Sequence, residues 1–189
     1  YGIFVNSEGN RFVSEDSYGA RIGHFCSKQP DQKAYLLVQN EDFSPSIYME
    51  KLPIVAVAET FEDLEKEAGF KPGTLSKTAK QYNNYANAGF DMDFRKDPKW
   101  LKEISRPPYA LIDYSFNVQR SPAYSDKTGP LMFTLGGLET LKTGEVLDKN
   151  GDIIPKLFAA GRTTAGLPRT GKGYSSGMSV GDATFFGRM

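Results

Sequence analysis

The segment formed by residues 157–188 places the strongest constraint on how this chain can fold. It opens with the apolar run 157–160, continues through a glycine-rich loop and ends in a stretch that predicts a helix from near Gly177 to Phe186. A buried strand, a flexible loop and a helix N-terminus in this order form an anion-binding corner, because the first helical amides lack partners and the helix dipole favours negative charge. An ordinary strand-loop-helix connection would have the same pattern.

The composition limits the classes of partner. The chain has 189 residues and a formal net charge of zero, which is enough for a real core in one or two domains. Without a basic tract, nucleic acid and anionic membrane surfaces are not expected partners. No apolar run approaches the roughly 20 residues that a membrane span needs. Cys26 is the only cysteine and cannot form an internal disulfide, so we expect a buried, unreactive thiol in a cytoplasmic protein.

Apolar spacing and local punctuation predict most of the elements. Two helices are expected at 60–68 and 73–88, the first with Thr60 as N-cap, and glycines follow both. Strands are expected at 2–5, 11–14, 34–38, 109–116, 131–138 and 145–154. The first two should pair as a hairpin, and Asn150-Gly151 should turn the last one back on itself. The carboxylates of residues 91–98 suggest a solvated loop, and no metal site is predicted.

Three segments carry a family resemblance. They are GIFVNSEGNRFVSED (2–16), FTLGGLET (133–140) and IPKLFAAGRTTAGLPRTGKGYSSGMSVGDATFFGR (154–188). They resemble, in the family's order, the flavoproteins that include fumarate reductase and succinate dehydrogenase flavoprotein subunits and the 3-ketosteroid dehydrogenases. Together they span nearly the whole chain.

The resemblance implies an α+β fold with FAD as cofactor. Residues 1–125 would be mainly a substrate-capping domain with its entry hairpin, and residues 126–189 would be the C-terminal strands and helix of a Rossmann-like FAD-binding domain. The GxGxxG unit that holds the ADP half of FAD in this family is absent from these residues. The implied partners are a small-molecule substrate and an electron acceptor.

The resemblance also implies the cofactor contacts. Arg162 and its neighbour would lie near the ribityl-phosphate side, the glycine pair of FTLGGLET would let the backbone approach the flavin ring, and the last helix would present its first amides to the ring. The residues concerned are Gly136, Gly137, Gly161, Arg162, Gly177, Ser179 and Val180. From the sequence, Arg162 could equally form a surface ion pair.

Departures from the family's dicarboxylate reductases point to the substrate. Where those enzymes hold substrate carboxylates with one histidine and two arginines, this chain has Phe133, Tyr174 and Phe43. A dicarboxylate would lose its bidentate partners. We therefore expect Phe133 and Phe43 to line a pocket for a neutral, hydrophobic carbonyl compound.

The motif GYSSG (173–177) resembles the tyrosine-containing loop of the ketosteroid 4-ene-forming dehydrogenases. The implied reaction is a desaturation next to a carbonyl, with Tyr174 polarising the carbonyl or relaying a proton, Ser176 assisting, and Tyr18 as a second tyrosine. Tyr18 could instead be a half-buried loop aromatic. Arg21 is better explained as structural, and His24, the only histidine, as a packing or surface residue.

The sequence thus favours an FAD-dependent oxidoreductase that desaturates a neutral 3-ketosteroid-like ketone, with hydride transfer to flavin N5. One alternative is an enoate or dicarboxylate reductase of the same family, which would place Arg162, Arg169 or Lys172 in the pocket. The other is a non-catalytic fragment without cofactor, because the ADP-binding fingerprint is missing.

Overall fold

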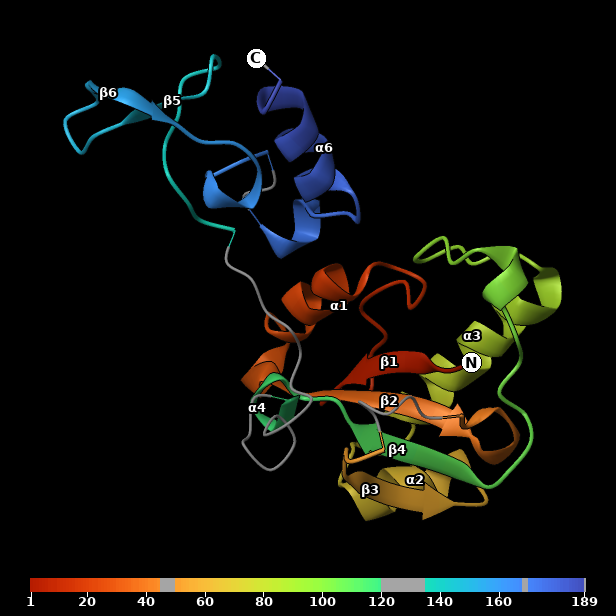
Figure 1. Cartoon of the computed structure of the whole chain (residues 1–189). Coiled ribbons are helices and arrows are strands. Elements are labelled where there is room, and N and C mark those ends of the chain that lie inside the picture. The colour runs from red at the N-terminus through yellow and green to blue at the C-terminus, as the bar shows by residue number, and fades with distance from the viewer. Residues whose placement is uncertain (45–49, 120–134, 168–169, 189) are drawn as a thin grey trace. The chain divides into compact units, whose positions relative to one another are not determined.

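The computed structural model describes residues 1–44, 50–119, 135–167 and 170–188. These residues form two compact units (Figure 1). Unit 1 comprises residues 1–17, 25–44 and 50–119, and unit 2 comprises residues 18–24, 135–167 and 170–188. The described residues form both helices and paired strands, so the chain is a mixed α/β protein. All strand pairs within the two sheets of these residues are antiparallel.

Unit 1 is built on a four-stranded antiparallel sheet with the order β1-β2-β4-β3. The strands are β1 (Ile3–Asn6), β2 (Ala34–Gln39), β3 (Ile54–Ala58) and β4 (Tyr109–Asp113). The predicted strands at 2–5, 34–38 and 109–116 are therefore confirmed, although the last is shorter and is followed by α4 (Phe116–Gln119). The edge strand β3 was not predicted, and its Ile54 and Val57 are about half exposed.

Two predicted helices, α2 (Phe61–Ala68) and α3 (Thr74–Ala88), are confirmed with their caps. The Thr60 hydroxyl accepts a 3.1 Å hydrogen bond from the Asp63 amide. The helices share a core with the sheet, in which the side chains are almost fully buried: Ile3, Val5, Leu37 and Leu111 from strands, and Leu64, Leu75, Ala79 and Tyr82 from helices. Short 3-10 turns at Pro30–Gln32, Asn40–Asp42 and Pro98–Trp100 complete the unit.

The predicted hairpin between residues 2–5 and 11–14 is confirmed only as a turn closed by one antiparallel bridge, Val5 to Arg11. Residues 11–14 do not form a strand, and the strand partner of β1 is β2. The Asn6 carboxamide oxygen accepts from the amides of Glu8 and Asn10, which closes a tight turn directly after β1. After that turn the chain leaves the sheet, because the Arg11 side chain forms buried ion pairs with Glu15 and Asp91.

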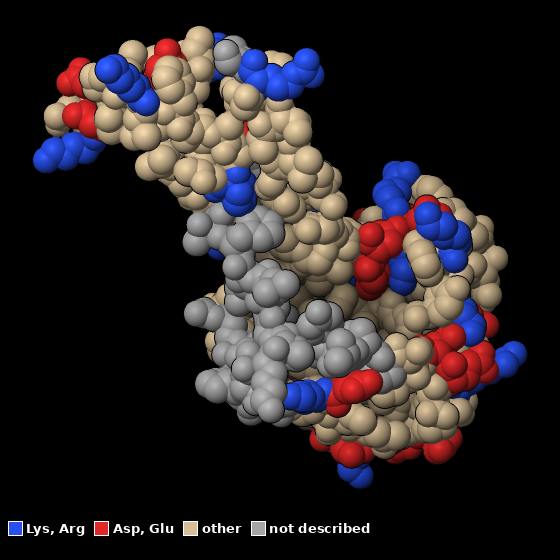
Figure 2. Space-filling view, in the orientation of Figure 1, with Lys and Arg blue, Asp and Glu red and all other residues tan. Residues whose placement is uncertain are grey.

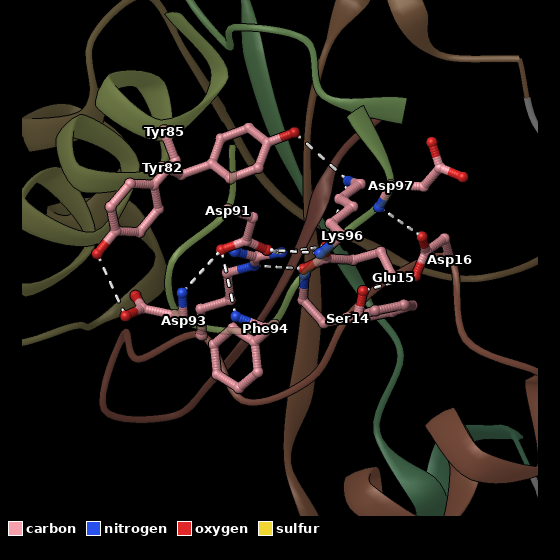
Figure 3. A network of polar contacts seen from close by, with 12 residues as sticks. Ser14, Glu15, Asp16, Tyr82, Tyr85, Asp91, Asp93, Phe94, Lys96 and Asp97 are labelled. Atoms are coloured by element: carbon pink, nitrogen blue, oxygen red, sulfur yellow. Dashed lines mark hydrogen bonds and ion pairs between the residues drawn. The ribbon is translucent and has the colours of Figure 1, made fainter. Parts of the chain in front are cut away.

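That network also corrects the prediction of a solvated loop at residues 91–98 (Figure 3). Asp91 is fully buried, and its carboxylate lies 2.8 Å from Nη2 of Arg11. Glu15 accepts from Nε and Nη2 of Arg11, at 2.8 and 2.7 Å, and lies 3.2 Å from Nζ of Lys96. Two cations and two carboxylates thus compensate one another inside unit 1, as buried charges must.

Unit 2 contains the hairpin of β5 (Glu145–Leu147) and β6 (Ile153–Phe158), with Gly151 at a φ of 88° in its turn. This confirms the turn predicted at Asn150-Gly151. The buried strand predicted at 157–160 is wrong: β6 is largely exposed, because no other described element packs a second layer over it. Of the strand predicted at 131–138, residues 131–134 lie outside the described residues, and Leu138 makes a single parallel bridge to Thr164.

The rest of unit 2 is helical or looped. It holds the start of α1 (Gly19–Cys26), the 3-10 turns Gly161–Thr163 and Gly171–Gly173, and α6 (Met178–Phe186), which confirms the helix predicted after Gly177. Within the described ranges no helix is both long and apolar enough to cross a membrane. Figure 2 shows acidic and basic side chains intermingled on the visible face of unit 1.

Candidate functional site

Tyr18 and Tyr174 lie together in unit 2, although 156 positions separate them in the sequence. Their ring centroids are 5.4 Å apart, with an angle of 38° between the planes. Tyr18 directly precedes α1, and its carbonyl accepts from the amides of Arg21 and Ile22. Tyr174 follows the turn Gly171–Gly173 and is 8% exposed, whereas Tyr18 is 43% exposed. The structure thus brings two of the three predicted catalytic residues into contact.

The hydroxyl groups of Tyr174 and Ser179 are 3.3 Å apart, at hydrogen-bond distance. Ser179 is the second residue of α6, so the phenol is directed toward the N-terminal end of this helix. Sequence reasoning assigned only the backbone of Ser179 a role and missed its side chain. Ser176, the third predicted catalytic residue, is exposed.

The start of α6 keeps unused donors. Gly177, at a φ of 90°, precedes the helix, and a side chain there would meet open space. No described group accepts a hydrogen bond from the amides of Ser179 and Val180. These amides lie at the positive end of the helix dipole, where an anionic or electron-rich group would be stabilised.

Gly161 joins the loop tightly to α6. Its amide donates a 2.9 Å hydrogen bond to the buried carboxylate of Asp182, a residue that sequence reasoning did not single out. A Cβ on Gly161 would lie 2.7 Å from the Cβ of Ala183. Gly161 therefore has a packing role in this structure, in addition to any contact with a cofactor.

Gly161→Ala is expected to destabilise unit 2 by about 1–3 kcal/mol, because the added methyl group overlaps Ala183 and the φ of 72° disfavours alanine. Gly181→Ala on α6 is the matched control, since its Cβ would meet open space and alanine favours helices by up to about 1 kcal/mol. Urea unfolding followed by circular dichroism measures both. Equal stability of the two variants would contradict the packing role.

Arg162 does not form the surface ion pair that was one interpretation of the sequence. Its Nη2 donates to the carbonyl oxygens of Leu135 and Thr164, at 3.0 and 3.2 Å, and its buried Nε has no partner among the described residues. Gly137 packs against the backbone of Thr164 so closely that a side chain would clash, whereas Gly136 faces open space.

A cavity of about 380 Å³ lies within unit 2, between residues 138–142, residues 164–167 and α6. Apolar side chains including Leu138, Leu141 and Phe186 form much of its wall, and Asp182 reaches it. None of the predicted catalytic residues lines this cavity.

The structure does not show the two predicted substrate-pocket residues, Phe133 and Phe43, lining one pocket. Phe133 lies outside the described residues, as does Arg169. Phe43 follows the turn Asn40–Asp42 in unit 1 and is 36% exposed. Lys172 is exposed in unit 2.

Cys26 is fully buried, as expected. Burial raises the pKa of its thiol to about 12, so the thiolate is not available at neutral pH. In the described part of the chain, no group of three or more His, Cys, Asp or Glu side chains is arranged to hold a metal ion.

Comparison with known proteins identifies a family model, described as an FAD binding domain, that matches residues 2–177. A "probable fumarate reductase" of Shewanella frigidimarina is 31% identical over 193 residues, which cover 99% of this chain and 30% of the relative. A 3-oxosteroid 1-dehydrogenase of Mycobacterium tuberculosis is 26% identical, over 98% of this chain and 37% of the relative. The chain thus spans about a third of the length of these relatives.

A solved structure is also similar. The 3-ketosteroid-Δ4-(5α)-dehydrogenase of Rhodococcus jostii RHA1, in complex with 4-androstene-3,17-dione, matches with a TM-score of 0.75 and 36% sequence identity. The match covers 99% of this chain and 37% of that one.

Proposed function

Because the chain belongs to the FAD-binding domain family, whose cofactor is FAD, we propose that it contributes the substrate-capping domain and the closing part of the flavin domain to an FAD-dependent oxidoreductase. In this proposal residues 1–125 are mainly the cap, and residues 126–189 are the C-terminal strands and helix of a Rossmann-like domain. An electron acceptor and a small-molecule substrate are its partners.

The residues of unit 2 fit a flavin. Three hydrogen-bond donors have no acceptor among the described residues: the amides of Ser179 and Val180 and the Nε of Arg162. Gly177, directly before α6, borders open space. Of these donors the Nε of Arg162 is buried, and buried donors without partners are rare in folded proteins. The helix amides are N-terminal donors of the kind that bind anionic or electron-rich groups. We assign the cofactor contacts to these residues and to Gly136, which also faces open space.

The proposed reaction is the desaturation of a neutral, 3-ketosteroid-like ketone. When bound, FAD supplies the acceptor, at N5, for the hydride that leaves the carbon β to the carbonyl. Tyr174 donates a hydrogen bond to the substrate carbonyl or relays a proton, and Ser179 orients its hydroxyl. Tyr18, as its phenolate, accepts the α-proton, and the exposed Ser176 assists Tyr174.

The contact between Tyr18 and Tyr174 is the observation that carries this proposal. Of two phenols side by side, the one bonded to a serine at a helix N-terminus can polarise a carbonyl, and the other, once ionised, can accept a proton. Neither role needs a cation. The similarity to a solved ketosteroid dehydrogenase supports the same substrate class. Arg162 is already engaged by two carbonyl oxygens, which weakens its candidacy as a clamp for a substrate carboxylate.

A direct substrate comparison tests the proposal. The purified flavoprotein is assayed with a saturated 3-ketosteroid and an artificial electron acceptor, and separately with fumarate and a reduced viologen dye. We expect turnover of the ketosteroid and none of fumarate. Fumarate reduction without ketosteroid oxidation would favour the dicarboxylate reductase, and neither reaction in a flavin-loaded sample would refute both assignments.

A further inference from the structure

Gly171 lies where two segments of unit 2 that are distant in the sequence touch. It opens the 3-10 turn Gly171–Gly173, and the start of α1 packs against it. A Cβ on Gly171 would lie 2.9 Å from the carbonyl oxygen of Ala20 and 3.1 Å from the Cβ of His24. The first distance is below van der Waals contact and its partner is a backbone atom, so only a residue without a side chain lets α1 come this close.

Close packing, and not backbone conformation, is what position 171 requires. The φ of Gly171 lies outside the left-handed region in which an alanine would be strained. The same is true of Gly173, where a Cβ would meet no atom closer than the Thr170 hydroxyl oxygen, at 3.7 Å. The two glycines of this turn therefore differ chiefly in the contact with α1.

Each tyrosine of the pair is attached to one side of this contact. The Tyr18 carbonyl accepts from the amides of Arg21 and Ile22, at 2.8 and 3.1 Å, so the Tyr18 backbone is bonded into the first turn of α1. The Gly171 carbonyl accepts from the Tyr174 amide at 3.3 Å. A shift of α1 away from the turn would thus separate the two rings, whose centroids are 5.4 Å apart.

We propose that Gly171 is a positioning residue: because it has no side chain, α1 packs directly on the turn, and this contact sets the distance between the rings of Tyr18 and Tyr174. All of these groups belong to unit 2. The effect on turnover rests on the proposed function, in which the two phenols act on the substrate. A displacement of about 1 Å in a catalytic site can lower a rate about 10²-fold.

Fluorine NMR of the purified flavoprotein labelled with 3-fluorotyrosine measures the geometry without any assay of activity. The Tyr174 signal is the one that disappears in Tyr174→Phe, and Tyr18→Leu shows where this signal lies without the neighbouring ring. In Gly171→Ala we expect the signal to move toward that position, because α1 is displaced. Gly173→Ala is the matched control and should leave the signal in place. Gly171 is only partly buried, so its variant should fold.

Turnover of a ketosteroid tests the catalytic consequence through a double-mutant cycle. Gly171→Ala should lower turnover about 10- to 100-fold, and Tyr18→Phe should lower it at least as much. In the combined variant the loss from Gly171→Ala should be less than about twofold, because a residue that acts through the Tyr18 hydroxyl has no effect once that hydroxyl is absent. A merely structural defect would add its full factor. Gly23→Ala, which adds a methyl group to α1 in open space, should leave turnover unchanged.

Three results would overturn the positioning role: an unmoved Tyr174 signal in Gly171→Ala, an equal movement in Gly173→Ala, or an undiminished loss of turnover from Gly171→Ala in the Tyr18→Phe background. Another result would count against the proposed function alone. If the signal moves as expected but Tyr18→Phe and Gly171→Ala both keep full turnover, Gly171 positions Tyr18 and the tyrosine pair is not catalytic.

Discussion

Tyr174→Phe is expected to lower turnover by about 10²- to 10⁴-fold, which is the usual contribution of a positioned acid or base. The ring is kept, so its contact with Tyr18 and its buried position should remain, while the hydroxyl that faces Ser179 is lost. FAD binding should change little. Steady-state turnover of a ketosteroid and the flavin absorbance of the purified variant measure the two quantities.

Two further variants separate catalysis from structure. Tyr1→Phe, at an exposed ring in unit 1, should leave turnover unchanged. Ser179→Ala should reduce turnover less than Tyr174→Phe, and Ser179→Thr should restore part of it, because a hydroxyl again faces the phenol. Unchanged turnover in Tyr174→Phe would remove this residue from the mechanism, and loss of flavin would assign it to cofactor binding instead.

Arg11→Ala should destabilise unit 1 by about 3–5 kcal/mol, because it leaves the buried carboxylate of Asp91 without its cation. Glu15 keeps Lys96, but Asp91 has no second cation in the described structure. Arg106→Ala, which breaks the exposed pair with Glu41, should cost no more than about 1 kcal/mol. Urea unfolding monitored by fluorescence of Trp100, the only tryptophan of this chain, measures both.

The stability difference between Arg11→Ala and the unaltered protein should depend on pH. Burial alone would raise the pKa of Asp91, but the hydrogen bond and charge of Arg11 outweigh it and hold that pKa below its ordinary value. A depressed carboxyl pKa stabilises the fold above the unfolded-state pKa, near 3.8, and this contribution is lost as the pH falls through the folded-state value. The difference should therefore be largest near neutral pH and shrink as the pH falls, starting above the ordinary carboxyl pKa, because burial without Arg11 raises the pKa of Asp91 in the folded variant. A constant difference down to pH 2 would contradict the role of Asp91.

Local signals were sufficient for α2 and α3. Thr60, Gly69 and Gly89 mark helix ends through interactions that involve only nearby residues, and α2 and α3 have the predicted boundaries to within a residue. The strand β3 was missed because its sequence, IVAVA, lacks the polar alternation that identifies a half-buried strand. Its assignment depends on pairing with β4, which lies more than fifty residues later.

Long-range polar contacts could not be predicted from spacing. Arg11 and Asp91 are 80 positions apart, and nothing in the sequence near Asp91 distinguishes a buried carboxylate from a solvated one. The contact between Tyr18 and Tyr174 was anticipated only through the resemblance of two motifs to one family. The Ser179 side chain and the Asp182 carboxylate were missed, because a serine and an aspartate near a helix start are common caps.

The assignment of residues 18–24 to unit 2 matters for protein engineering. These residues carry Tyr18, yet the chain on both sides of them belongs to unit 1. If unit 1 were exchanged between two such proteins through a single junction, residues 18–24 would move with it, and Tyr18 and Tyr174 would come from different proteins. Chimeras that are meant to alter specificity would therefore have to transplant this short insertion together with the loop around Tyr174, as one discontinuous module.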